Sequence, residues 1–197
     1  MKRVVLKTPK QVILTITGAS GVGKTTIIKK LLETRPDVKL IKSWTTRGPR
    51  ESDLPGEYEY NVPAEEMQIL EKDFFKIFNA HGNSYGTLKK SVVEAFLDSE
   101  PRILILVPEA VEAIRDYFSK YDVYLERIVS FYVLSPGEEE LRRRLSGRNE
   151  TDIQKRIDDC KKWDDAAIAS DIPYIFLSNN KSVSGIDEVV GQMRVFL

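Results

Sequence analysis

The chain has 197 residues, of which 42% are hydrophobic and 30% are charged, a composition typical of a single globular domain. Thirty basic and thirty acidic side chains cancel, which weighs against nucleic acid as a partner. Cys160 is the only cysteine, so an intramolecular disulfide is excluded and a reducing compartment fits.

Neither a leader nor a membrane span is expected. The first ten residues are basic but contain no long apolar run, so they do not resemble a secretory signal peptide. No apolar run approaches the roughly 20 residues that a membrane-spanning helix needs. We therefore expect a soluble, cytoplasmic protein with no membrane partner, present as a monomer or a homodimer.

The first half of the chain predicts a strand, a helix and a β-rich segment. The nearly continuous apolar run at 12–17 is typical of a strand covered on both faces. Apolar residues at 27–32 recur with helical spacing. The segment 43–85 is rich in glycine and proline and holds short alternating runs at 58–62 and 74–78. These features predict a small β-rich insertion after the first helix.

Strand and helix signals alternate in the second half as well. The helical stripes lie at 92–97, 111–118 and 186–193, and the apolar, strand-like runs lie at 103–107, 128–134 and 174–177. A polar, charged insertion at about 137–163 interrupts this pattern. Strands that alternate with helices predict a doubly wound α/β fold around a parallel sheet.

A phosphate-binding loop is expected at 18–25. Its sequence, Gly18-Ala19-Ser20-Gly21-Val22-Gly23-Lys24-Thr25, matches G-x-x-x-x-G-K-[ST] in full. The motif lies between the predicted strand and the predicted helix, where the helix N-terminus favours an anion. We expect Lys24 to hold the β- and γ-phosphates of ATP and Thr25 to ligate Mg²⁺. The expected ATP-binding residues are Gly18, Ala19, Ser20, Gly21, Val22, Gly23, Lys24, Thr25 and Thr26.

Further segments resemble signatures of the guanylate kinase family. Residues 43–50, Ser-Trp-Thr-Thr-Arg-Gly-Pro-Arg, resemble S-x-T-T-R-x-P-R. Residues 55–60 resemble G-x-x-Y-x-F, with Tyr60 where phenylalanine is usual, and residues 81–87 resemble H-G-N-x-Y-G-[TS]. Residues 144–148, with Arg156 later, look like the arginine-bearing lid of the family. The resemblance runs from about Val12 to the C-terminus.

This resemblance implies one P-loop domain with three parts. These are a three-layer core at about 1–42, 88–136 and 164–197, a β-rich insertion at about 43–87 that binds the nucleoside monophosphate, and a helical lid at about 137–163. The implied activity is ATP-dependent phosphoryl transfer to a nucleoside monophosphate, with GMP or dGMP first. The implied acceptor-binding residues are Ser43, Arg47, Arg50, Tyr58, Lys76, Tyr85 and Thr87. The implied catalytic residues are Lys24, Arg144, Arg148 and Arg156.

Physical chemistry supports these assignments, because the reaction gathers several negative charges. Arg47 and Arg50 are three residues apart and can grip one phosphate bidentately, which lysine cannot do. Arginines of the lid can neutralise charge on the transferring group. Arg142 and Arg143, in contrast, follow three glutamates and are typical of a solvated helix with i,i+4 ion pairs.

The positions that read the base in the family differ here. Lys76 stands where the family has a glutamate, and Ile105 and Val107 replace two aspartates. Lysine has no acceptor for the N1–H and N2–H₂ donors of guanine. The loss of the aspartates leaves Thr25 and the phosphates themselves to hold Mg²⁺.

Several explanations of this difference stay open. The acceptor is a different compound, such as another ribo- or deoxynucleotide, a modified nucleotide or ribose 1,5-bisphosphate. Alternatively, Glu59, Asn79 or Glu109 supplies the missing acceptor atoms. A non-catalytic binding module is a further alternative, although the intact phosphate-binding loop weighs against it. A kinase acting on a polymer lacks the expected basic signal.

Overall fold

The computed structural model describes residues 11–80, 82–146, 153–179 and 183–197. Three residues of the motifs above, His81, Gly147 and Arg148, lie outside these ranges. In the described part of the chain, no helix is both long and apolar enough to cross a membrane.

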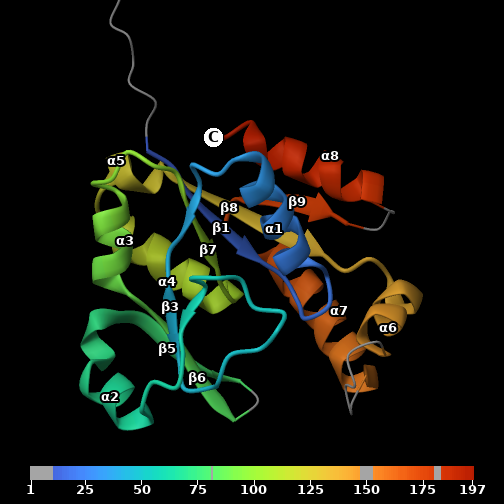
Figure 1. Cartoon of the computed structure of the whole chain (residues 1–197), viewed down its shortest axis with the longest axis horizontal. Coiled ribbons are helices and arrows are strands. Elements are labelled where there is room, and N and C mark those ends of the chain that lie inside the picture. The colour runs from blue at the N-terminus through green and yellow to red at the C-terminus, as the bar shows by residue number, and fades with distance from the viewer. Residues whose placement is uncertain (1–10, 81, 147–152, 180–182) are drawn as a thin grey trace, which may run out of the picture.

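A five-stranded parallel sheet forms the centre of the molecule (Figure 1). Its order is β2 (Lys39–Leu40), β7 (Arg102–Ile105), β1 (Ile13–Thr17), β8 (Ile128–Leu134) and β9 (Tyr174–Ser178). Four of its strands overlap the predicted apolar runs, and the short strand at Lys39–Leu40 was not predicted. Every residue of β1 is buried, because this strand pairs on both edges, with β7 and with β8, and apolar clusters cover both faces of the sheet. The loop that follows β1 therefore starts from the most enclosed strand of the sheet.

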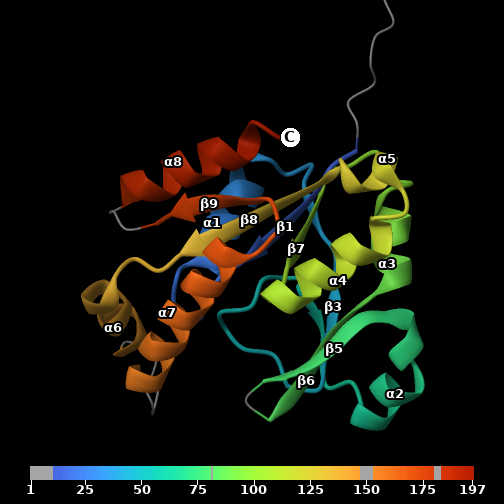
Figure 2. The same cartoon turned by 180° about the vertical axis from the view of Figure 1, so that it is seen from behind.

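Helices cover both faces of the sheet, which gives the predicted three layers (Figures 1 and 2). On one face, α1 (Lys24–Thr34) and α8 (Val183–Arg194) pack against Leu14 and Ile16. On the other, α3 (Lys89–Ala95) and α4 (Pro108–Phe118) pack around Ile13 and Tyr132. The short helix α5 (Asp122–Leu125) leads into β8.

A second, smaller sheet forms the predicted β-rich insertion, in the order β4 (Tyr58–Glu59), β3 (Ser43–Thr45), β6 (Asn83–Leu88) and β5 (Phe74–Ala80). The helix α2 (Ala64–Ile69) and a 3₁₀ turn at Glu71–Asp73 precede β5. The predicted strand at 58–62 is wrong beyond Glu59, because Asn61 has a left-handed φ of 55° that ends the extended backbone.

Two helices, α6 (Glu138–Ser146) and α7 (Ile153–Ala169), occupy the region of the predicted lid. On α6, Arg142 pairs with Glu138 at the predicted i,i+4 spacing, whereas Arg143 pairs with Glu140 at i,i+3. Both arginines thus form exposed ion pairs within the helix, as expected. Helix α7 continues beyond 163 to Ala169 without a break. No change of element therefore marks the expected boundary between lid and core.

Two expectations for the second half are wrong in detail. The strand expected at 103–107 ends at Ile105, because Val107 is already the N-cap of α4, whose first turn contains a proline. Leu97 does not share the buried stripe of α3 and is 78% exposed. The reason is that α3 ends at Ala95, so Leu97 no longer follows helical spacing.

Candidate active site

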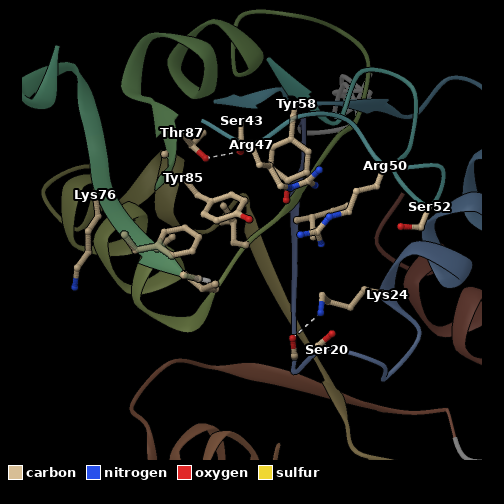
Figure 3. Close-up of a pocket in the computed structure, with 18 of the residues that line it drawn as sticks. Ser20, Lys24, Ser43, Arg47, Arg50, Ser52, Tyr58, Lys76, Tyr85 and Thr87 are labelled. Carbon is tan, nitrogen blue, oxygen red and sulfur yellow. Dashed lines mark hydrogen bonds between the residues drawn. The ribbon is translucent and has the colours of Figure 1, made fainter. Parts of the chain in front are cut away.

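A cavity of about 780 Å³ lies between the phosphate-binding loop, the small sheet and α7. Figure 3 shows the loop residues Ser20 and Lys24 on one side and the aromatic and basic residues of the insertion on the other. Its lining includes Gly18, Ser20 and Lys24 from the loop, Ser43, Arg47, Arg50, Tyr58, Lys76, Tyr85 and Thr87 from the insertion, and Arg156 from α7.

Glycine is required at two positions of the loop. Gly18 has a φ of 138°, and a Cβ there would lie 2.5 Å from the carbonyl oxygen of Val133. Gly23 has a φ of 103°, and a Cβ there would lie 2.5 Å from Nδ2 of Asn179. Both contacts are too short for a carbon atom, so β8 and the residue after β9 hold the loop in its compact form.

The lysine of the loop folds back over the loop itself. Lys24 Nζ donates to the carbonyl oxygens of Gly18, at 2.6 Å, and Ala19, at 2.9 Å. The remaining predicted ATP-binding residues form the loop behind the cavity lining and the first turn of α1; they are Ala19, Gly21, Val22, Gly23, Thr25 and Thr26. The ammonium group therefore lies where backbone N–H groups and the N-terminus of α1 also favour an anion.

The structure brings all seven predicted acceptor residues to the same cavity. Arg47 lies on Tyr58, with its guanidinium carbon 4.8 Å from the ring centre. Burial raises the pKa of the Tyr58 hydroxyl above its usual value, so this group stays a hydrogen-bond donor at neutral pH. Figure 3 shows Arg50 reaching from the insertion toward Lys24. Two guanidinium groups and tyrosine hydroxyls thus face the phosphate-binding loop.

Hydroxyl groups and an aromatic pair form the wall of the insertion. Ser43 Oγ and Thr87 Oγ1 lie 2.7 Å apart and share a hydrogen bond. Phe78 stacks on Tyr85 with 5.1 Å between ring centres and 14° between planes. The sequence analysis did not single out Phe78. The sequence feature that could have identified Phe78 is the two-residue periodicity of a strand, which places Lys76, Phe78 and Ala80 on one face of β5.

The end of the cavity near Lys76 has little capacity to accept hydrogen bonds. Lys76 is exposed and lies apart from Arg47 and Lys24 in Figure 3. Ile105 and Val107 add apolar wall, and among the described lining residues the only carboxylate is that of Glu51, next to Arg50 in the sequence. This end is therefore suited to flat, partly apolar ligand groups more than to a row of N–H donors.

The suggested substitutes for the missing carboxylates have other neighbours in this structure. Glu59 pairs with Lys42, and Asn79 accepts a hydrogen bond from Ser84. Glu109 lines a different hollow, between α4 and the end of α7. None of the three is among the described residues that line the cavity. Asn79 lies on the other face of β5, and Glu59 and Glu109 belong to β4 and α4.

The arginines of the lid region divide into two groups. Arg156 of α7 lines the cavity. Arg144 of α6 does not: its Nη1 donates to the carbonyl oxygen of Val22 at 3.1 Å, and its Nη2 donates to that of Asn179 at 2.8 Å. It therefore supports the loop from behind. Arg148 lies outside the described residues.

Asn179 was not among the predicted site residues. Its Nδ2 also donates to the Val22 carbonyl, at 3.1 Å, and its side chain is almost completely buried. The sequence carried only a weak signal, an asparagine directly after the last core strand. Together, Asn179 and Arg144 place two donors on one carbonyl of the phosphate-binding loop, which fixes the orientation of that peptide.

A phosphate-binding loop, a facing cluster of arginine and tyrosine side chains, and an arginine from a neighbouring helix define a P-loop kinase that acts on a small phosphorylated acceptor. The family model described as guanylate kinase matches residues 9–192. The chain belongs to the guanylate kinase family and is a nucleoside monophosphate kinase.

Individual relatives agree with this assignment. A guanylate kinase of Prochlorococcus marinus subsp. pastoris is 33% identical over 95% of this chain and 97% of its own length. One from Dechloromonas aromatica is 32% identical over 74% of this chain and 69% of its own length. The crystal structure of guanylate kinase from Anaplasma phagocytophilum shares the fold, with a TM-score of 0.67 and 23% identity over 95% of this chain and 86% of that one.

Proposed function

We propose that this protein transfers the γ-phosphoryl group of ATP to the phosphate of a nucleoside monophosphate, with GMP or dGMP as the preferred acceptor. One observation carries the proposal: a single cavity contains both Lys24 of the phosphate-binding loop and the cluster of Arg47, Arg50, Tyr58 and Tyr85. Donor and acceptor phosphates can therefore meet in one cavity, which is what this reaction requires.

Different residues bind the two phosphorylated substrates. Lys24 leaves the carbonyl groups of Gly18 and Ala19 and binds the phosphates of ATP. Arg47 and Arg50 bind the phosphate of the acceptor, and Arg156 neutralises charge on the transferring group. No general base is needed because an ionised phosphate is already a nucleophile, so positioning and electrostatics supply the rate enhancement.

Magnesium enters as part of the substrate, the Mg·ATP complex. In the part of the chain that the structure describes, no three His, Cys, Asp or Glu side chains form a metal cluster. Thr25, half-buried in the first turn of α1, fits a site in which the protein contributes one hydroxyl. Phosphate oxygens and water would complete the coordination, an arrangement that Mg²⁺ commonly adopts.

ADP release from Mg·ATP across a panel of acceptors tests the proposal. The panel contains GMP, dGMP, AMP, CMP, UMP, dTMP and ribose 1,5-bisphosphate, and Lys24→Ala serves as the inactive control. We expect turnover with GMP or dGMP to exceed the others. Failure of every nucleotide, with ATP still bound, would contradict the proposal and favour a non-catalytic binding module.

A second candidate is a kinase with another acceptor. It is favoured by Lys76, Ile105 and Val107, which leave the base end of the cavity without the carboxylates that guanine's donors need. The same panel separates the two candidates: a preference for a pyrimidine nucleotide or for ribose 1,5-bisphosphate would identify a cavity whose specificity has changed.

A further inference from the structure

Arg47 is held by a carboxylate that the sequence motifs did not indicate. Its Nη1 lies 2.7 Å from Oδ2 of Asp53, and its Nη2 lies 2.9 Å from Oδ1. The two side chains are only 8% and 10% exposed. Nη1 also donates to the carbonyl oxygen of Gly48, at 2.9 Å. A bidentate pair of this kind fixes the plane of the guanidinium group as well as its position.

Asp53 also organises the loop that joins the two arginines. Its Oδ2 accepts a hydrogen bond from the backbone N–H of Arg50, at 2.8 Å. The hydroxyl of Tyr60 hydrogen-bonds to the same carboxylate, and the Arg47 guanidinium carbon lies 5.5 Å from the Tyr60 ring centre. One carboxylate thus receives donors from both arginines and from a tyrosine at a position where the family usually has phenylalanine.

Both partners of the pair stay charged at neutral pH. Burial is the largest single influence and would raise the pKa of Asp53 and lower that of Arg47, but the hydrogen bonds and the charge attraction around the pair together outweigh it. The pKa of Asp53 is therefore lowered and that of Arg47 is raised. Because the folded-state pKa of Asp53 is depressed, the pair is complete at neutral pH and is lost only as the pH falls through that depressed pKa.

Arg47 keeps unused hydrogen-bonding capacity. Within the described part of the chain, its buried Nε has no hydrogen-bond partner, although Arg47 lines the cavity. A buried donor without an acceptor is unfavourable by about 1–3 kcal/mol. Because Nε is buried, a phosphate oxygen reaches it only after a small adjustment of the loop on binding.

We propose that Asp53, itself held by the Tyr60 hydroxyl, is the positioning residue of the acceptor-phosphate site: it orients the Arg47 guanidinium so that the group receives a phosphomonoester dianion. This inference rests on the proposed function, since it deepens the role of the same cavity. The carboxylate has donors on both oxygens, from Arg47 and from the backbone N–H of Arg50. Asp53 therefore acts through Arg47 and not by contact with the acceptor.

Steady-state kinetics test the inference, first with GMP varied at saturating Mg·ATP and then with Mg·ATP varied at saturating GMP. Asp53→Asn keeps the shape of the side chain but replaces one acceptor oxygen by a donor that faces Arg47. We expect its KM for GMP to rise about 10- to 100-fold, with kcat and the KM for ATP changed by less than about threefold. Asp53→Glu should restore part of the loss, and Arg47→Ala sets the upper limit of the effect.

Tyr60→Phe is the milder variant, because it removes one hydroxyl and leaves the ring in place. We expect about a two- to fivefold rise in the KM for GMP, near the lower end of the effect of one hydrogen bond, because Tyr60 acts on Arg47 only through Asp53. This variant is expected to fold, so the inference stays testable if Asp53→Asn does not.

Matched controls come from the surface of the same chain. Asp37→Asn breaks another bidentate arginine pair, in which Arg35 Nε and Nη2 lie 2.8 and 2.6 Å from the carboxylate oxygens; this pair is more exposed than that of Arg47 and lies outside the cavity lining. Tyr121→Phe removes an exposed hydroxyl. Neither should change either KM. Thermal denaturation of every variant separates general loss of stability from a specific effect on the acceptor.

Two outcomes would overturn the inference while leaving the proposed function intact. One is an unchanged KM for GMP in Asp53→Asn and Tyr60→Phe while the wild type remains active. The other is an equal change in the KM for GMP and the KM for ATP that correlates, across the variants, with the loss of thermal stability. A wild-type protein that phosphorylates no nucleoside monophosphate would overturn the proposed function, and the inference with it.

Discussion

The two ends of the cavity are built on different principles. At the phosphate end, backbone geometry holds the binding groups: Gly18 and Gly23 adopt conformations that a side chain would block, and Val22 is fixed by two donors. At the base end, side chains of several elements set the chemistry, among them Lys76 of β5, Ile105 of β7 and the hydroxyl pair of Ser43 and Thr87. Substitutions at the base end therefore change recognition without disturbing the fold.

This contrast explains why the donor site follows the family closely while the base end does not. A phosphate-binding loop tolerates few residue types, because the glycines are required for its backbone conformation and the lysine is required for its positive charge. A side chain that recognises the base has to satisfy only one requirement, complementarity to the hydrogen-bond donors and acceptors of the ligand. Variants of the two ends should consequently differ in kind as well as in size.

The largest effect is expected at the phosphate end, for Lys24→Ala. The ammonium group is the one side-chain cation of the loop, and its removal should lower kcat by at least about 10²- to 10³-fold. The fold should persist, because Lys24 is only half-buried and its hydrogen bonds go to carbonyl groups of the loop itself. ADP release and circular dichroism measure the two properties.

Lys30→Ala provides a control on the same helix. Lys30 lies farther along α1 and forms a long, exposed pair with Asp187, so its loss should leave turnover unchanged. Turnover by Lys24→Ala at the wild-type rate would show that the loop does not bind the transferring phosphates, and the contrast between the two ends would lose its basis.

An intermediate effect is expected behind the loop, for Arg144→Ala. This variant removes one of the two donors on the Val22 carbonyl and the donor on Asn179, so the loop should become less rigid. We expect the KM for ATP to rise about tenfold, in line with the loss of hydrogen bonds from a charged group. The KM for the acceptor should change little.

Arg143→Ala is the matched control for this prediction. Arg143 neighbours Arg144 and pairs with the same glutamate, but its side chain is 72% exposed, so its removal should alter neither KM nor stability measurably. A rise in the acceptor KM for Arg144→Ala, with no change for ATP, would instead place Arg144 on the acceptor side of the reaction.

Most of the fold followed from the sequence because the core elements carry strong periodic signals. The apolar runs of β1 and β8 and the stripe of α4 reflect burial on both faces or on one face, which local sequence records directly. The errors lie at ends and turns. The left-handed Asn61 and the end of α3 before Leu97 depend on neighbouring segments that no local pattern contains.

The site was predictable to the extent that motifs encode it. The loop and the two arginines of the insertion lie within short, specific patterns, and the structure brings them to one cavity. Asp53, Phe78 and Asn179 were missed because each acts through a tertiary contact: an ion pair with Arg47, a ring stack, and a hydrogen bond to Val22. Such contacts become visible only once the chain is folded.

The smallest effect is expected at the base end, for Lys76→Glu. A carboxylate there could accept hydrogen bonds from guanine N1–H and N2–H₂, which a lysine cannot. Because position 76 is exposed, solvent weakens any such contact to about 0.2–1 kcal/mol, so kcat/KM for GMP should rise only about two- to fivefold. Activity with pyrimidine nucleotides should stay the same or fall. Acceptor competition assays with Lys72→Glu, which carries the same charge change outside the cavity lining, separate base recognition from a general charge effect. Equal changes in the two variants, or none in either, would mean that the base is read elsewhere in the cavity, with the shared hydroxyl pair of Ser43 and Thr87 as the nearest remaining acceptors.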